Sequence, residues 1–365
     1  MKNKILIVTS EFPPQPGGIG NHALHLSLQL QRNGYEVTVI TDQRDKDINN
    51  DLLFDATLNI EVVRIPRKNP SIFTYLQRFR VALPLVRNNN LILASGKFSL
   101  WLVGFYSWLF KSKQYIAVLH GSELGAGGKW GRKITTWSLK RYHKLIAVSN
   151  FTKELAHTIS NNLDITVINN GFSPKGNNAG IFARDSNLNI ITVGNVTSRK
   201  GQQNVIKALP LIKKKYPEVL YHIVGLPTEK IGFLELARQL EVEDSVIFHG
   251  ALSNEELQTQ LLQAHVFFML SDILPNGDVE GFGIAVLEAN DYYIPAIGSK
   301  NSGIADAIKD GYSGKLVDPH NPQEILRALD CILEDYETYS NQAKKWSEKF
   351  YWENIIQEYL KEIEV

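Results

Sequence analysis

Short runs of β-branched and apolar residues alternate with helix-length segments along the whole chain, and this alternation restricts the fold more than any other feature. Strands separated in this way are typical of parallel sheets with crossover helices. We therefore expect an α/β protein built from two Rossmann-like, doubly wound parallel sheets. The predicted strands span residues 5–9, 37–41, 60–65, 91–93, 115–119, 145–148 and 166–168 in the first half, and 190–193, 219–224, 246–248, 266–270, 296–297 and 315–317 in the second.

A chain of 365 residues is too long for one ordinary hydrophobic core, which also favours two domains. The polar stretch 169–180, rich in Asn, Gly and Pro, separates the two series of strands. We expect an N-terminal domain over 1–170, a linker over 171–188 and a C-terminal domain over 189–340. The carboxyl edges of both sheets are expected to face a central cleft, where sheets of this kind bind small ligands.

Bulk composition is that of a soluble globular protein, with 44% hydrophobic and 21% charged residues. Cys331 is the single cysteine, so no internal disulfide can form and a reducing compartment is favoured. The first ten residues pass straight into a predicted strand without a signal-peptide pattern. The apolar run Phe98–Phe110 is short for a membrane span, and we interpret it as a buried helix.

The formal net charge of +1 conceals a strong charge asymmetry along the chain. Residues 1–170 contain 21 Lys and Arg against 11 Asp and Glu, and between Arg64 and Lys144 there are fifteen basic residues and one acid, Glu123. This bias indicates an anionic partner: a lipid headgroup surface, a lipid-linked pyrophosphate or, least favoured, nucleic acid. Residues 71–87 fit a basic amphipathic helix interrupted at Pro84, with Arg78 and Arg80 as membrane-facing candidates. An ordinary solvated surface helix remains an alternative.

Two carboxylates, Glu280 and Glu288, bracket a Gly-Phe-Gly turn that leads into an apolar helix. A helix that begins near Gly283 presents its unpaired N–H groups and the positive end of its dipole to an anionic ligand. Glu280 can accept hydrogen bonds from sugar hydroxyls, and Glu288 can reach a second polyol such as a ribose. The pair therefore predicts a nucleotide-sugar site, although a loop acid and a solvated helix residue would have the same spacing.

Further polar residues follow predicted strands. Arg199 and Lys200 lie between the first strand of the second domain and a helix, where two cations suit a leaving diphosphate without a metal. His120 comes directly after the strand 115–119, and Gly121 gives access to the backbone there. An exposed basic turn and a structural histidine are the alternatives for these two segments.

The first loop contains Gly18, Gly20 and Ala23 in the spacing of a dinucleotide-binding fingerprint, with Asp42 at a suitable distance beyond. Those glycines should form the turn directly after the strand, whereas several residues with three prolines intervene here. We therefore reject a dehydrogenase. A long glycine-rich loop with a helix beginning near Asn21 can instead offer amides to a diphosphate.

Taken together, these motifs resemble the retaining glycosyltransferases of family 4, which have the GT-B architecture. The resemblance extends over essentially the whole chain, and the stretch from Glu280 to Glu288 is its most specific part. It also suggests that residues 341–365 are C-terminal helices that cross back to the N-terminal domain, which would be the acceptor side. The matching segments are 17–20, 120–121, 149–150, 170–171, 199–201, 280–288 and 351–355.

The resemblance implies a role for each matching residue. Arg199 and Lys200 would hold the donor diphosphate, His120 would bond the transferred sugar, and Glu280 would position its hydroxyls; these four are the expected catalytic residues. The expected donor-binding residues are Gly17, Gly18, Phe282, Gly283, Ile284, Ala285 and Glu288. Neither a metal nor a cofactor is expected, since the nucleotide sugar is a substrate.

Two positions depart from the family pattern. Asn195 stands where the family often has an arginine, which leaves the strength of the diphosphate clamp open. Phe172 follows the Asn-Gly of the linker motif, where an aspartate is common, and this change is interpreted as structural.

We therefore expect a retaining hexosyltransferase that uses a nucleotide-diphospho-sugar and a lipid-linked or saccharide acceptor in envelope polysaccharide or glycolipid synthesis. GDP-mannose is the first expectation for the donor, and a UDP-sugar is the next. GDP-mannose comes first because the sequence around Glu280 resembles that of bacterial mannosyltransferases with lipid acceptors. The expected location is cytoplasmic, with peripheral attachment to the inner face of the cytoplasmic membrane, and nucleic acid is not an expected partner. Alternatives are a nucleotide-sugar 2-epimerase, a phosphorylase, and a degenerate sugar-nucleotide-binding protein.

Overall fold

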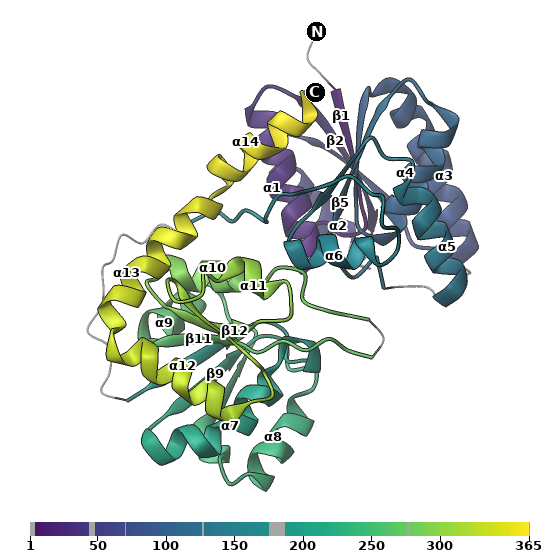
Figure 1. Ribbon diagram of the computed structural model, residues 1–365. Helices are drawn as coiled ribbons and strands as arrows, with labels where there is room; N and C mark the ends of the chain where they lie inside the picture. The colour runs from purple at the N-terminus through teal and green to yellow at the C-terminus, as the bar shows by residue number, and fades with distance from the viewer. Residues whose placement is uncertain are drawn as a thin grey trace. The chain divides into compact units, whose positions relative to one another are not determined.

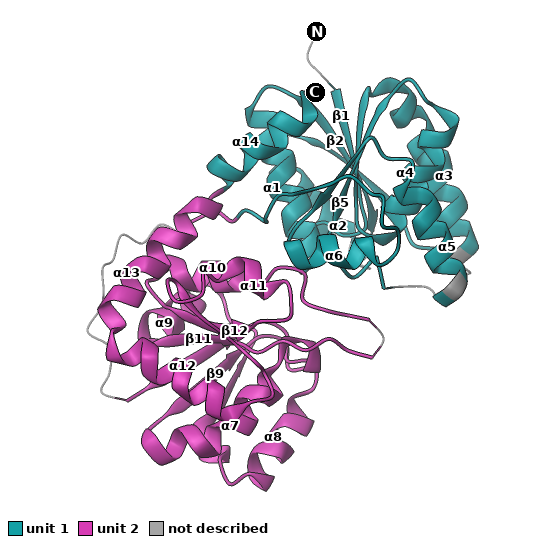
Figure 2. Cartoon of the chain, viewed as in Figure 1, with its two compact units in different colours: residues 1–171, 352–365 teal, residues 172–351 magenta. Residues whose placement is uncertain are grey.

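The chain folds into two compact units, each with its own parallel sheet (Figures 1 and 2). The computed structural model describes residues 4–43, 48–69, 71–125, 128–174, 187–275 and 277–364. Unit 1 comprises residues 1–171 and 352–365, and unit 2 comprises residues 172–351. The α/β class and the Rossmann-like architecture of both units are confirmed. Each unit is described by itself below.

Among its described residues, unit 1 has seven strands in the order β3-β2-β1-β4-β5-β6-β7, all paired in parallel. Its central strands are almost wholly buried, as expected for a sheet covered on both faces. The order reverses between β1 and β4, which creates the switch point at which such sheets bind ligands. The strands are β1 (Lys4–Thr9), β2 (Glu36–Gln43), β3 (Glu61–Pro66), β4 (Leu91–Ser95), β5 (Gln114–Leu119), β6 (Lys144–Ala147) and β7 (Ile165–Val167).

Helices cover both faces of this sheet. In Figure 1, α1 and α14 lie on one side of it, and α3, α4 and α5 lie on the other. The described helices of unit 1 are α1 (Gly18–Arg32), α2 (Ile48–Asp55), α3 (Ser71–Asn88), α4 (Lys97–Leu109), α5 (Gly128–Leu139), α6 (Asn150–His157) and α14 (Trp352–Ile363).

The C-terminal helix α14 is an integral part of unit 1. Its Tyr359 hydroxyl lies 3.0 Å from Nε2 of His22 on α1, and both side chains are buried. Trp352, at the start of α14, is fully buried beside Gly171, where a β-carbon would come within 2.7 Å of the indole. Only glycine leaves room for this ring.

The described part of unit 2 has six parallel strands in the order β10-β9-β8-β11-β12-β13, with its switch point between β8 and β11. The strands are β8 (Asn189–Val193), β9 (Leu220–Val224), β10 (Val246–Gly250), β11 (Val266–Met269), β12 (Ala296–Ser299) and β13 (Gly314–Val317). The α-helices are α7 (Gln202–Lys215), α8 (Lys230–Gln239), α9 (Asn254–Gln263), α10 (Ile284–Asp291), α11 (Ile304–Ala307), α12 (Pro322–Glu334) and α13 (Tyr336–Ser347).

The unit boundaries fall at 171/172 and 351/352. Residues 341–365 were predicted to return to the N-terminal domain. Of this segment, residues 341–351 belong to unit 2, and the part from residue 352 onward, which forms α14, belongs to unit 1. Most of the predicted linker 171–188 lies outside the described residues.

Two predictions about helices of unit 1 are wrong. Helix α1 begins at Gly18 instead of Asn21. Helix α3 continues through Pro84 to Asn88 instead of breaking there. Pro84 removes one N–H of the helical ladder, and its exposed position allows water to solvate the carbonyl that loses this partner.

Arg78 of α3 is also not the membrane-facing residue that the sequence suggested. Its side chain is buried, and its guanidinium donates two hydrogen bonds to the carboxylate of Asp42, one of them at 2.9 Å. The same guanidinium lies 4.0 Å from the centre of the Phe98 ring. A buried charge needs such a partner, so Arg78 fastens α3 to the end of β2.

Within the part of the chain that the structure describes, no helix is both long enough and apolar enough to cross a membrane. Helix α4, predicted to be a buried helix, has a buried face built around Phe98 and Val103 and an exposed face with Phe105 and Trp108. It is therefore only partly the core helix expected.

Candidate functional site

The loop after β8 brings two cations to the carboxyl edge of the sheet of unit 2. A single 3₁₀ turn, Ser198–Lys200, connects β8 to α7. Gly201 ends this turn with φ of 79°, and a β-carbon there would lie 1.8 Å from the carbonyl oxygen of Leu270. Only glycine allows this approach. The contact fixes Arg199 and Lys200 beside the end of β11.

Arg199 and Lys200 both pair with Glu280, so the structure brings together three residues that the sequence predicted separately. Nζ of Lys200 lies 2.7 Å from Oε2 of Glu280, and Nη1 of Arg199 donates to the same oxygen. Nε of Arg199 also lies 3.4 Å from Oδ2 of Asp278. We call Arg199, Lys200 and Glu280 the ion triad.

Burial alone would raise the pKa of Glu280, but Lys200 and Arg199 outweigh this effect, and the pKa is lowered from its ordinary value. The carboxylate is therefore ionised at neutral pH, with only 13% of its side chain exposed. With Asp278 included, two cations face two carboxylates, so the cluster carries no net charge when no ligand is bound.

A second set of hydrogen bonds holds the segment that carries the cations. The backbone N–H of Asp272 donates to the carbonyl of Arg199 at 3.1 Å. The Asp272 carboxylate accepts from Nδ2 of Asn204 at 2.8 Å and Nε2 of Gln203 at 3.0 Å, and it lies 2.9 Å from Nε2 of His320. This arrangement restricts the loop before any ligand arrives, which favours tight and specific binding.

The loop of Glu280 is fixed from its other side by Gly303. The N–H of Gly303 donates to the carbonyl of Glu280 at 3.1 Å. A β-carbon at Gly303 would stand 2.0 Å from the carbonyl oxygen of Gly281, so this approach also requires glycine. The carboxylate of Glu280 is therefore positioned by its backbone as well as by its cations.

Helix α10 begins where the sequence predicted. Gly283 caps it in the left-handed region with φ of 87°, and Ile284 and Ala285 form the first helical positions. Phe282 is buried with only 2% of its surface exposed, so its ring serves packing while its backbone remains part of the turn. The first turn of such a helix offers N–H groups and a positive dipole end to an anion.

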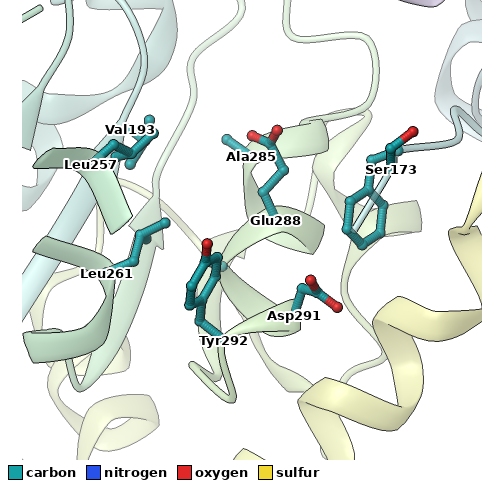
Figure 3. Close-up of a pocket in the computed structure, with 10 residues that line it drawn as sticks. Ser173, Val193, Leu257, Leu261, Ala285, Glu288, Asp291 and Tyr292 are labelled. Atoms are coloured by element: carbon teal, nitrogen blue, oxygen red, sulfur yellow. The ribbon is translucent and has the colours of Figure 1, made fainter. Parts of the chain in front are cut away.

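Glu288 lines a small pocket one turn further along α10 (Figure 3). Its carboxylate extends beside Ala285, with Val193, Leu257 and Leu261 on one side and Ser173 on the other. The apolar side comes from the end of β8 and from α9. The lining residues are Phe172, Ser173, Val193, Leu257, Leu261, Ala285, Glu288, Ala289, Asp291 and Tyr292.

His120 lies at the carboxyl end of β5 in unit 1, as predicted. Its Nε2 is 2.9 Å from Oγ of Ser95, the last residue of β4, and its backbone N–H donates to Oε1 of Glu123 at 2.5 Å. The ring of His22 approaches edge-on, with a centroid distance of 5.1 Å. Burial lowers the pKa of His120 from 6.5 to about 4. The imidazole is therefore neutral at pH 7 and acts as a hydrogen-bonding group.

Gly17 and Gly18 lie at the start of α1, the first as its N-cap and the second as its first residue. A β-carbon on Gly18 would meet nothing within 4 Å, whereas one on Gly17 would approach the carboxylate of Glu11. The open space at Gly18 leaves the backbone there accessible to a ligand.

Some contributors were not predicted from the sequence. Ser95 contacts His120, Asp272 supports the cations and Asp278 approaches Arg199. Ser95 and Asp272 each follow a predicted strand, so position alone was an available signal. No group of three or more His, Cys, Asp and Glu side chains that could hold a metal ion occurs among the described residues.

Two family models together match nearly the whole chain. "Glycosyltransferase Family 4" matches residues 16–175, and "Glycosyl transferases group 1" matches residues 179–349. The first corresponds to unit 1 and the second to unit 2.

Individual proteins show the same likeness. An uncharacterized glycosyltransferase of Methanocaldococcus jannaschii is 29% identical over 97% of this chain and 96% of its own length. The GDP-mannose-dependent alpha-(1-6)-phosphatidylinositol monomannoside mannosyltransferase of Mycolicibacterium smegmatis is 25% identical over 91% of this chain and 89% of its own. Anabaena HepE, solved with UDP and glucose, is 18% identical with a TM-score of 0.79 over 99% of both chains, which shows the fold. The chain belongs to glycosyltransferase family 4, has the GT-B fold and is a transferase enzyme.

Proposed function

We propose that this enzyme transfers a hexose from a nucleotide-diphospho-sugar to a hydroxyl of a lipid-linked acceptor, with retention of the anomeric configuration. The observation that carries the proposal is the ion triad beside the capped N-terminus of α10. Two cations beside the N-terminus of a helix are suited to bind the negative charges of a diphosphate. A carboxylate beside them can accept hydrogen bonds from the hydroxyls of a sugar.

In the donor complex, Arg199 and Lys200 hold the diphosphate, and the amides of Gly283, Ile284 and Ala285 complete its cradle. The carboxylate of Glu280 takes the place of an external anion when no donor is bound. Once the diphosphate neutralises the cations, Glu280 is available to accept hydrogen bonds from hydroxyls of the transferred sugar. Glu288 binds the ribose, and the apolar side of its pocket receives one face of the base.

The chemical step breaks the bond between the anomeric carbon and the diphosphate oxygen, and forms a bond between that carbon and the acceptor oxygen on the same face. The acceptor hydroxyl proton passes to the departing phosphate oxygen, so the products are a glycoside and a nucleoside diphosphate. Arg199 and Lys200 stabilise the charge that develops on the leaving group, without a metal. Neutral His120 bonds the transferred sugar, and the backbones of Gly17 and Gly18 contact the diphosphate.

GDP-mannose is our first choice of donor, and a UDP-sugar is the second. The mannosyltransferase relative from Mycolicibacterium smegmatis supports the first, and its name also specifies a lipid acceptor. The fifteen basic residues between 64 and 144 support an acceptor with an anionic, lipid-linked group. A cytoplasmic enzyme attached peripherally to the inner membrane face, active in envelope polysaccharide or glycolipid synthesis, fits this acceptor.

The test is a panel of GDP-, UDP- and ADP-sugars, each incubated with a lipid-linked acceptor that has a free hydroxyl, in which release of nucleoside diphosphate is measured, followed by NMR of the product glycoside. We expect release with one base and one sugar, and a product with the anomeric configuration of the donor. If no sugar nucleotide is turned over, and none shifts the melting temperature, the proposal is wrong. An inverted product would overturn retention alone.

The same panel separates the enzymatic alternatives. A 2-epimerase would convert the sugar nucleotide without an acceptor, and the comparisons give this alternative no support. A degenerate binding protein would shift the melting temperature with a donor but release no nucleotide.

A further inference from the structure

Three neighbouring helices of unit 1, α3, α4 and α5, enclose a pocket that the proposed chemistry does not use. Its volume is about 230 Å³, and aromatic and aliphatic side chains such as Phe79, Trp101, Leu102 and Trp137 line it. Apolar cavities of about 150 Å³ already take up benzene. We call this space the α3–α5 pocket.

Two of the polar groups in its wall are already bonded to protein partners. Arg78 is bound to the carboxylate of Asp42, and Nε1 of Trp101 donates to Oγ1 of Thr135 at 3.0 Å. With these donors occupied, the wall offers mainly ring faces and aliphatic carbon to a ligand. A hydrocarbon chain fits such a lining, whereas a sugar would lose its hydrogen bonds to water.

The same three helices expose large apolar side chains, and four of these, Tyr75, Phe105, Ile134 and Trp137, line the α3–α5 pocket. Trp130 is 77% exposed, Leu76 is 59% exposed and Trp108 is 54% exposed. The exposed large apolar residues of α3, α4 and α5 are Ile72, Phe73, Tyr75, Leu76, Phe105, Trp108, Leu109, Trp130, Ile134 and Trp137.

The charges interspersed with these side chains are positive. Lys97, Lys133 and Arg141 lie over the rings of Trp101, Trp130 and Trp137, at 5.6, 5.1 and 3.9 Å from their centres. The one acid between residues 64 and 144, Glu123, is only 1% exposed. An apolar pocket with a cationic surround complements an anionic amphiphile.

Helix α4, which lines the α3–α5 pocket, follows the strand whose last residue contacts the candidate catalytic histidine. Ser95 ends β4 and contacts His120, and Phe98, which lines the pocket, lies in the first turn of the helix that follows. Oγ of Ser99, in that same turn, donates back to the carbonyl of Gly96 at 2.6 Å and so fixes the start of α4.

We propose that the α3–α5 pocket binds the hydrocarbon chain of a phosphate-bearing lipid, and that this lipid is the acceptor. The identification as acceptor rests on the proposed function, whereas the binding of an anionic amphiphile does not. One chain of one lipid enters the pocket, and the surrounding cations engage its phosphate.

Calorimetric titration with decyl phosphate, at concentrations where it stays monomeric, tests the binding. We expect saturable binding of one molecule per chain, with no binding of inorganic phosphate and weaker binding of decanol. Ile134→Trp places a larger side chain in the pocket at a half-exposed position, whereas Ile72→Trp adds the same ring to α3 outside the pocket. Each methylene group of the ligand that the new ring keeps out of the pocket loses about 0.8 kcal/mol of binding free energy. We therefore expect the affinity for decyl phosphate to fall more than about tenfold in Ile134→Trp and to stay unchanged in Ile72→Trp.

A second variant, Phe105→Ala, removes part of the wall and should also weaken binding, with circular dichroism as the check on folding. Equal affinity in Ile134→Trp and Ile72→Trp would overturn the proposal. It would also fail if the enzyme bound phosphatidylglycerol vesicles but not monomeric decyl phosphate, since the face would then serve bilayer adsorption. A dimer that Ile134→Trp dissociates would identify a second copy of the chain as the occupant and would overturn it too.

Failure here and failure of the proposed function have different signatures. If the enzyme releases nucleotide from a sugar donor but does not bind decyl phosphate, the proposed transferase function stands and the proposed lipid pocket is wrong. If it binds decyl phosphate but turns over no donor, the lipid pocket stands and the proposed transferase function is wrong. If the lipid is the acceptor, a decyl phosphodiester whose head group carries a free hydroxyl should raise nucleotide release in Ile72→Trp and not in Ile134→Trp.

Discussion

The ends of β4 and β5 in unit 1 and the loops after β8 and β11 in unit 2 carry different chemistry, although both sheets are parallel and doubly wound. In unit 2, the two cations of the ion triad are paired with the carboxylates of Glu280 and Asp278. In unit 1, His120 is buried and neutral at pH 7, and it contacts Ser95, a second neutral group. The comparison shows that the fold determines where a binding site can form, at the carboxyl ends of the strands. The residues that follow each strand determine whether that site binds a charged group or makes hydrogen bonds between neutral groups.

The largest effect should come from the charged edge. Lys200→Ala removes a cation that would face the leaving diphosphate, so we expect kcat/KM for nucleotide release to fall by about 10²–10³-fold. Lys207→Ala, at an exposed position of the following helix, should have no effect and serves as the control. An equal loss in both variants, or none in Lys200→Ala, would remove the triad from the mechanism.

The neutral edge should instead be sensitive to acid. Because the pKa of His120 is about 4 in the folded protein and 6.5 in an exposed histidine, the unfolded chain takes up the proton first as the pH falls. Its contribution to stability is present above 6.5 and is lost between 6.5 and about 4. From about pH 7 to about pH 5 the loss should be about 2 kcal/mol.

Urea unfolding of the wild type and of His120→Gln, followed at several pH values, measures this contribution. Glutamine retains hydrogen-bonding capacity toward Ser95 but does not titrate, so its unfolding free energy should depend less on pH over this window. Parallel pH profiles for the two proteins would contradict a neutral, buried His120.

The difference between the two edges also explains what the sequence could predict. Strands could be located because buried parallel strands are continuous apolar runs, and Gly283 marked the start of α10 because a left-handed cap favours glycine. His120, Arg199 and Glu280 were found because polar residues directly after strands gather at one sheet edge. These are local signals.

Pairings between distant segments could not be predicted in the same way. Glu280 was assigned to sugar hydroxyls, yet in this structure it pairs with cations about eighty residues earlier in the chain. Arg78 was assigned to the surface because its helix is amphipathic and basic, but Asp42, at the end of another strand, draws it inward. The partner of a charge depends on which loops the topology brings together, and a single sequence does not contain that information directly.

Glu288→Ala should have a smaller effect than Lys200→Ala, because it removes hydrogen bonds to the ribose and leaves the reacting bond untouched. We expect KM for the donor to rise about tenfold with little change in kcat. Glu235→Ala, an exposed position of unit 2, is the matched control. A fall in kcat at unchanged KM would indicate that Glu288 acts on the transition state instead.

The smallest predicted effect concerns Asn195, which is exposed in the loop that carries the two cations and stands where the family often has an arginine. Asn195→Arg adds a third cation to the loop that carries Arg199 and Lys200. In the free enzyme this charge is repelled by Arg199 and Lys200, so the melting temperature should fall slightly. When a diphosphate is bound, the added arginine attracts it. Affinity for the nucleoside diphosphate should then rise about threefold, as expected for one exposed ion pair.

Titration calorimetry at low and high salt tests whether the gain in affinity depends on charge, because screening should abolish such a gain. Unchanged affinity at low salt would mean that Arg199 and Lys200 already complete the clamp.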